Sequence, residues 1–195
     1  MLTSSRCSGD IILCDHFFSF VYIHLIHMFS TDETIAPKHE FKRILYHVYA
    51  NVRSYRAYND RFHDQSFSDD VSKNLQTIYF SGVGAHHQNS VAKLCIRRVF
   101  EIARNLLFHA KRHWPEVMDP IFWTMPPKEV VRAHSNFHFD KDGHNLISEL
   151  HNTTERPMAK NHTWGCPIYV SDNRLQTVSK ILKWEPRAHL GVYML

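Results

Sequence analysis

The chain has 195 residues, a formal charge of +4 with its sixteen histidines neutral, and 44% hydrophobic residues. This length suits one domain, or one and a fraction, and the composition excludes an intrinsically disordered chain. The mildly basic balance is compatible with polyanionic partners but does not identify one. The four cysteines form neither a C-x-x-C pair nor a zinc-binding frame with histidine. We therefore expect a reduced, intracellular protein, and the sequence does not distinguish nucleus from cytoplasm.

The first hydrophobic run, from Ile11 to Ser30, is the one stretch long enough to suggest a membrane span. One aspartate and three histidines interrupt it, and each would be costly in lipid. Two adjacent strands, Ile11–Asp15 and Phe20–Met28, explain the run better, because it is rich in isoleucine, valine, tyrosine and phenylalanine. We therefore expect no membrane partner.

The next elements alternate between helix and strand. Ser30-Thr31-Asp32 is typical of a helix start and predicts a helix of about 14 residues, with Pro37 tolerated only in its first turn. A strand is predicted from Tyr49 to Ala57. A short helix at Phe67–Asn74 and a short strand at Gln76–Ser81 should follow.

Gly82 to Lys111 is the most informative stretch, a glycine-rich loop followed by a long amphipathic helix. Asn89 or Ser90 can cap this helix. Steps of three and four residues place the following apolar residues on one face for about five turns: Val91, Cys95, Val99, Ile102, Leu106 and Ala110. The other face is basic, with Lys93, Arg97, Arg98, Arg104, Lys111 and Arg112.

The last third of the chain is less regular. Met125-Pro126-Pro127 should break a helix or delay its start to about Lys128. Residues 133–160 are polar and predict a loop with one helical turn at Leu146–Leu150. Beyond it, Trp164–Val170 is predicted to be a strand with a tight entry turn. Lys183–Tyr193 is predicted to be an aromatic and basic loop that leads into another strand.

Two motifs carry a resemblance to a known family. GVGAHHQNSVA at Gly82–Ala92 resembles the loop and helix start of the integrase core in copia-type, retrovirus-related retrotransposon Pol polyproteins, roughly G-x-x-x-H-x-Q-N-G-x-A-E. The glutamate of that pattern is the last member of the family's Asp, Asp, Glu metal-binding triad, and Lys93 stands there. RAYNDRF at Arg56–Phe62 resembles the second triad motif, roughly H-A-D-N-G-x-F, with Tyr58 at the aspartate position. Tyr58 and Lys93 are 35 residues apart, which is the interval of the family.

The resemblance implies an α/β fold: a ribonuclease H-like integrase core at residues 9–125, an irregular linker at 126–160 and a truncated SH3-like β module at 161–195. WGCPIYV and KWEPRAHLGVY are similar to segments of that module. The two strands at Ile11–Asp15 and Phe20–Met28 match the second and third strands of the family core. The resemblance thus implies that the first strand, with the first catalytic aspartate, lies beyond the N-terminus.

The intact family holds Mg²⁺ or Mn²⁺ with carboxylates and catalyses polynucleotidyl transfer. Tyr58 offers a neutral phenol, and Lys93 offers a positive charge that repels a divalent ion. Asp60 and Asp64 are nearby carboxylates, and exposed loop positions explain them better than a substitute metal site. We therefore expect no metal cofactor and a catalytically inactive copy, although the parent family is enzymatic.

The resemblance also implies nonspecific DNA binding and the possibility of a homo-oligomer. The candidate DNA-binding residues are His86, His87, Gln88, Asn89, Lys93, Arg97 and Arg104. A solvated basic helix face explains the cations equally well. Two alternatives to an integrase fragment stay open: a domesticated, non-enzymatic DNA-binding or interaction protein, and a decayed gene product without a stable fold.

Overall fold

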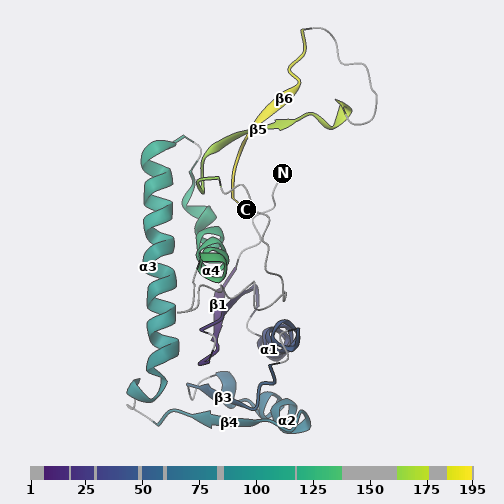
Figure 1. The fold of residues 1–195 in the computed structure, drawn as a ribbon, viewed down its shortest axis with the longest axis vertical. Coiled ribbons are helices and arrows are strands. Elements are labelled where there is room, and N and C mark those ends of the chain that lie inside the picture. The colour runs from purple at the N-terminus through teal and green to yellow at the C-terminus, as the bar shows by residue number, and fades with distance from the viewer. Residues whose placement is uncertain are drawn as a thin grey trace.

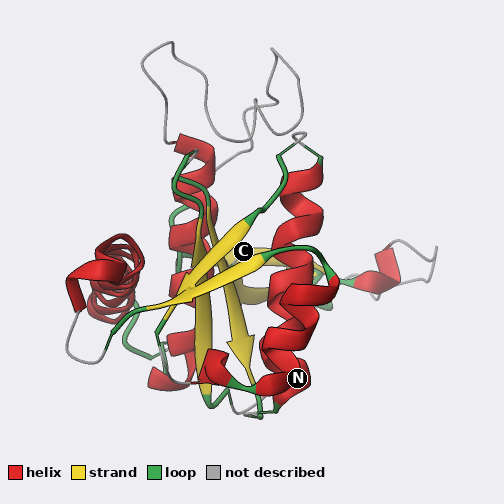
Figure 2. Ribbon diagram, turned by 90° about the horizontal axis from the view of Figure 1, so that it is seen from below, coloured by secondary structure: helices red, strands yellow, loops and turns green. Residues whose placement is uncertain are grey.

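The computed structural model describes residues 7–17, 19–28, 30–47, 50–58, 61–82, 86–116, 118–137, 162–175 and 184–194. It has a mixed α/β architecture (Figure 1). The strands are β1 (Gly9–Cys14), β2 (Val21–Ile26), β3 (Ser54–Ala57), β4 (Thr77–Phe80), β5 (Pro167–Ser171) and β6 (Ala188–Val192). The helices are α1 (Thr31–Tyr46), α2 (Gln65–Lys73), α3 (Ser90–His113) and α4 (Met125–Phe137). Figure 2 shows strands enclosed between helices on either side. None of the described helices is long and apolar enough to cross a membrane.

β1 and β2 form an antiparallel hairpin whose register runs from Gly9 opposite Ile26 to Cys14 opposite Val21. The two adjacent strands predicted from the first hydrophobic run are thus confirmed, although β1 begins earlier than predicted, at Gly9, and β2 is shorter at both ends. Ile11 and Ile26 are buried in the hairpin, and Val21 joins a core cluster with α3 and α4. The polar residues that interrupt this hydrophobic run are therefore explained by two half-buried strands, because each strand has one face against the core.

α1 begins where the sequence predicts it. The Ser30 hydroxyl caps the helix by accepting from the Glu33 N–H at 3.3 Å. The prediction that the helix tolerates Pro37 only in its first turn was wrong, because the proline lies in the second turn, inside the helix. A proline there removes one helical hydrogen bond, and its ring crowds the preceding turn. Its ring is fully buried next to the buried side chain of Lys38, which offsets part of that cost.

β3 and β4 form a parallel pair connected through α2, which is a βαβ unit. The predicted helix and second strand of this unit are confirmed. The first strand is shorter than predicted: it begins at Ser54 rather than Tyr49, and Ala50–Arg53 forms no regular element. The Gln76 side chain donates to the Val52 carbonyl at 2.6 Å and so holds this irregular approach against the start of β4.

α3 is the long helix that the sequence predicts, and four of the six predicted apolar positions, Cys95, Val99, Leu106 and Ala110, are buried or packed on the core, whereas two are not. Val99, Ala103 and Ala110 are buried, whereas Val91 and Ile102 are 42% and 50% exposed. The predicted stripe assigned larger side chains to the core, while the structure buries the small Ala103 because α3 lies close to α4 and β1. Asn89 occupies the capping position, yet its side chain makes no capping hydrogen bond.

The expected delay of α4 to Lys128 was wrong. A short 3-10 helix at Pro120–Thr124 leads directly into α4, which begins at Met125. Pro126 and Pro127 therefore lie in the first turn, where a missing N–H costs nothing, and both are fully buried. Residues 133–137, predicted as loop, belong to this helix. The predicted turn at Leu146–Leu150 lies outside the described residues.

β5 and β6 pair antiparallel at the end of the molecule opposite β3 and β4 (Figure 1), and the two strands predicted there are confirmed. Their entry turn packs on the C-terminal end of α3, where Ala110, Met118 and Trp164 form a buried cluster. Gly165 has a positive φ of 80°, and its hydrogen atom takes the place where a Cβ would lie 2.6 Å from the Ala110 Cβ. The close approach thus requires glycine.

Candidate functional site

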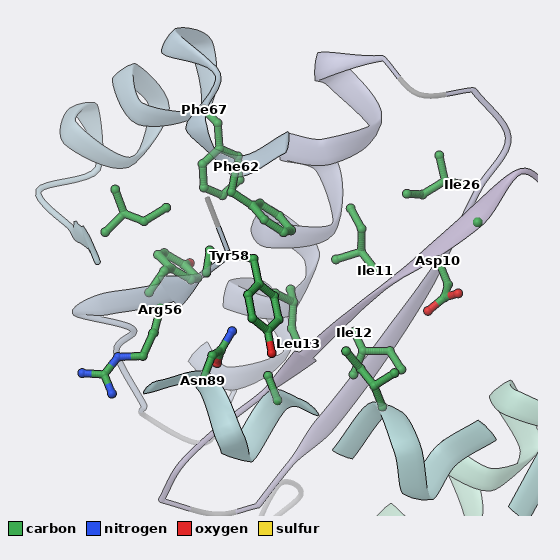
Figure 3. A pocket seen from close by; sticks show the side chains of 16 residues that line it. Asp10, Ile11, Ile12, Leu13, Ile26, Arg56, Tyr58, Phe62, Phe67 and Asn89 are labelled. Carbon is green, nitrogen blue, oxygen red and sulfur yellow. The ribbon is translucent and has the colours of Figure 1, made fainter. Parts of the chain in front are cut away.

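The two predicted triad positions lie at one end of the βαβ unit. Tyr58 follows the last residue of β3 and lines a cavity of about 400 Å³ between β1 and β3 (Figure 3). Asn89 and Ala92 line the same cavity from the start of α3, and Lys93 is the next residue, with an exposed side chain. The chain thus brings both sequence motifs to one place.

The connection between β3 and α3 is held by Gln88. The Arg56 guanidinium donates to the Gln88 carbonyl at 3.1 Å, and the Gly82 N–H donates to the Gln88 side-chain oxygen at 3.1 Å. Gln88, predicted to contact DNA, has a structural role here, because it joins Arg56 of β3 and Gly82 to the start of α3. This contact fixes where α3 starts relative to the cavity.

The residues at the triad positions do not fit a divalent metal ion. A phenol at Tyr58 and an ammonium at Lys93 supply no anionic oxygen. Across the described ranges, no group of three histidine, cysteine, aspartate or glutamate side chains is arranged to hold a metal. Asp64 instead accepts a hydrogen bond from the Thr31 hydroxyl at 2.7 Å and ties the start of α2 to the start of α1. Asp60 lies outside the described residues.

One carboxylate does reach the cavity. Asp10 comes from β1 and lies on the far side of the cavity from the Arg56 guanidinium (Figure 3). Burial raises the pKa of Asp10 above its ordinary value. No local sequence pattern predicts that Asp10 and Tyr58 line the same cavity, because this depends on how distant strands are placed.

The predicted cations of α3 lie on its solvent side. Lys93, Arg97 and Arg104 are all exposed, and spacings of four and seven residues align them along one stripe of the helix, with Lys111 seven residues further on. Glu101 lies 3.7 Å from Arg97 and offsets part of the charge. We call these four residues, Lys93, Arg97, Arg104 and Lys111, the basic stripe.

The other predicted DNA contacts are placed differently. Asn89 is 5% exposed and faces the cavity, so its side chain is not part of the surface that carries the basic stripe. His86 and His87 belong to a short 3-10 helix directly before α3, and their side chains lie outside the described part of the structure.

Sequence reasoning missed a buried ion pair beneath the cavity. Lys38 of α1 is 1% exposed and pairs with Asp70 of α2, while its ammonium lies 5.6 Å from the centre of the Phe67 ring. Burial alone would raise the pKa of Asp70, but Lys38 and His39 outweigh it and hold the pKa below the ordinary value. The pair joins α1 to α2. Sequence periodicity could not predict it, because a lysine is normally expected at the surface.

The sequence also gave no sign that Cys14 and Cys95 meet. Both are half-buried and pack against the cluster between β1, α3 and α4. A hydrogen bond between the thiols lowers the pKa of Cys95, with further help from Arg98, whereas that contact and burial raise the pKa of Cys14. Cys95 is therefore the more acidic thiol.

The chain resembles known proteins in structure but not in sequence. No protein-family model and no curated protein sequence matches the chain. A chain of the simian T-cell lymphotropic virus intasome, solved in complex with PP2A regulatory subunit B56 gamma, is similar in structure. Its TM-score is 0.50 at 12% identity, over 94% of this chain and 60% of that chain. The fold of this chain is integrase-like.

A second solved structure is the HTLV-2 integrase catalytic core domain in complex with magnesium. Its TM-score is 0.49 at 14% identity, over 72% of this chain and 82% of that chain. At such identities a similarity concerns the fold alone. The chain spans 60% of the length of the intasome chain that it matches.

Proposed function

We propose that this chain is a copia-type integrase core fragment that binds DNA without sequence preference and does not catalyse metal-dependent strand transfer. The observation that carries the proposal is the basic stripe on α3. Its four cations are exposed, come from a single rigid helix and begin one residue beyond the cavity that holds Tyr58. An integrase-like fold and the two sequence motifs support the assignment to this family.

The basic stripe suits phosphates rather than bases. Lysine and arginine side chains spaced along one helix can follow a phosphate backbone and release counterions, which gives salt-dependent binding without sequence readout. The ion pair between Arg97 and Glu101 is exposed and therefore weak, so Arg97 can exchange this partner for a phosphate.

The test is binding to a short duplex, measured by fluorescence anisotropy over a range of salt concentrations. Lys93→Ala, Arg97→Ala and Arg104→Ala combined should lower the slope of log K against log salt by about 3, since each phosphate contact contributes roughly 0.9. The matched control is Arg53→Ala, Lys73→Ala and Lys128→Ala, which removes the same charge from exposed positions on other elements. Equal losses in both triple variants would mean that net charge, not the stripe, holds DNA.

The inactive triad needs a separate test. We expect the parent chain to show no binding of Mg²⁺ or Mn²⁺ in a calorimetric titration, because neither Tyr58 nor Lys93 is an anionic oxygen ligand. Tyr58→Asp combined with Lys93→Glu should gain measurable affinity for either ion. Tight binding by the parent together with nicking of DNA would overturn this part of the proposal and leave the DNA-binding part standing.

A further inference from the structure

Two histidines meet on the surface of α3, at the end of the helix that packs against the β5–β6 hairpin (Figure 1). The ring centres of His109 and His113 are 4.4 Å apart, with 48° between the ring planes. Residues four apart lie on the same face of a helix, so their spacing in the sequence produces this approach. Both side chains are exposed. The pair is about 24 Å along the helix axis from Lys93, because each residue adds about 1.5 Å.

The ring nitrogens of both histidines are available to a ligand. Across the described residues, neither imidazole makes a hydrogen bond or an ion pair, and their ring contacts are with each other and with Trp114. The Trp114 ring centre lies 6.5 Å from that of His109 and 5.7 Å from that of His113. Neutral imidazole keeps a lone pair on one nitrogen, which makes histidine the commonest metal ligand in proteins.

The distance between the rings suits a single ion held between them. Zinc binds imidazole nitrogen at about 2.0–2.1 Å in tetrahedral geometry, which sets the ring centres of two ligands about 5 Å apart. The observed 4.4 Å is close to this value, so side-chain rotation is enough to form the site. The H-E-x-x-H helices of zinc proteins also hold their ion with two histidines four residues apart.

The charges around the pair act in both directions. The last carbonyl groups of α3 form the negative end of the helix dipole, which favours a cation in the final turn. Arg112 opposes this, because it is three residues from His109 and therefore next to it on the helix surface. Lys111 is two residues from each histidine and faces another side. Both cations are exposed, so solvent and salt screen their repulsion of an ion.

We propose that His109 and His113 form a surface site for one divalent ion of the Zn²⁺, Ni²⁺ and Cu²⁺ class. Imidazole suits these ions, whereas Mg²⁺ prefers oxygen ligands. Among the described residues no third histidine, cysteine or carboxylate completes the site, so water occupies the remaining positions of the ion. The site is separate from the triad positions and independent of the proposed DNA binding. A bound ion joins two consecutive turns of α3 beside the buried cluster of Ala110, Met118 and Trp164.

The test is calorimetric titration of the full 195-residue chain with Zn²⁺. His113→Ala should weaken binding at least about tenfold, since even the loss of a second-shell partner commonly costs that much. The matched control combines His113→Ala with Lys111→His. It keeps sixteen histidines but places the second one on another side of the helix, so it should not restore binding although it also removes a positive charge. Arg112→Ala should instead strengthen binding, because it removes a neighbouring positive charge.

Trp114 provides a readout of where the ion binds. Cu²⁺ quenches indole fluorescence at short range, so an ion between the two histidines should quench Trp114. Trp114→Phe should abolish most of the quenching by one equivalent of Cu²⁺ and leave the affinity for Zn²⁺ unchanged. Trp184→Phe, at an 89% exposed position before β6, should leave the quenching in place. Unchanged Zn²⁺ affinity in His113→Ala, or quenching that survives Trp114→Phe, would overturn the proposal.

Discussion

The two edges of β1 lie in contrasting surroundings. On one side β1 pairs with β2, and the hairpin packs with α3 and α4 around Val21, Val99, Ala103 and Val130. On the other side it faces a cavity of about 400 Å³, with β3 beyond it. The first region is built from neighbours in sequence and from a periodic helix, whereas the second lies between two strand pairs that form separate sheets among the described residues. The local sequence pattern thus accounts for the packing on the first side of β1, but not for the arrangement on the second side.

The buried ion pair next to Tyr55 and Phe67, two residues that line the cavity, offers the largest expected effect. Asp70→Asn leaves the buried ammonium of Lys38 without its charge partner, and removing one member of a buried pair costs about 3–5 kcal/mol. We expect a loss of this size in the free energy of unfolding, measured by urea denaturation. The double variant Lys38→Met and Asp70→Asn is the control and should recover most of the loss, since no buried charge remains. Equal losses in both would assign the effect to packing.

The same pair gives a pH dependence. Because the pKa of Asp70 is held below its ordinary value of 3.8, its contribution to stability is present above that value and is lost as the pH falls through the folded-state pKa. The difference in stability between the parent and Asp70→Asn should therefore be constant at neutral pH and shrink below pH 3.8. A difference that stays constant into stronger acid would contradict the charge-pair interpretation.

The contact between α3 and the β5–β6 hairpin should be nearly as sensitive. Gly165→Ala combines a left-handed backbone with a Cβ that would meet the Ala110 Cβ at 2.6 Å, and we expect a loss of about 3 kcal/mol in thermal unfolding. Gly191→Ala is the matched control, because its backbone is not left-handed and the nearest atom to its Cβ would be in the Val170 side chain, at 3.1 Å. Equal effects would show that β5 and β6 do not depend on close packing against α3.

In the first region, the buried face of α3 can be tested with two neighbouring aliphatic residues. Val99→Ala removes buried methyl groups from the cluster with α4 and should cost about 2 kcal/mol. Ile102→Ala, at a half-exposed position, should change stability by less than about 0.5 kcal/mol. Similar losses for the two variants in urea denaturation would support the stripe predicted from the sequence, which contains both residues, over the one in the structure.

These contrasts explain which features the sequence could predict. The β1–β2 hairpin, α2 and β4 follow from local runs and turn residues, and the structure confirms them. The stripe of α3 missed Ala103 because periodicity favours large side chains, whereas close helix packing favours a small one. The start of α4 was predicted too late because Pro126 and Pro127 would break the interior of a helix, whereas they are tolerated in its first turn. The Lys38–Asp70 pair and the cavity depend on contacts between distant segments, which no local pattern contains.

The smallest expected effect concerns Asp10, the acidic residue among those that line the cavity. Burial raises the pKa of Asp10, so its charged form opposes folding: the favourable contribution is present at low pH and is lost as the pH rises through the folded-state pKa. Asp10→Asn should therefore raise the melting temperature slightly at neutral pH, with no gain at a pH below the ordinary value of 3.8. Differential scanning calorimetry at pH 7 and at a pH below 3.8 checks this. A melting temperature that Asp10→Asn leaves unchanged at neutral pH would mean that burial does not penalise the charged form of Asp10.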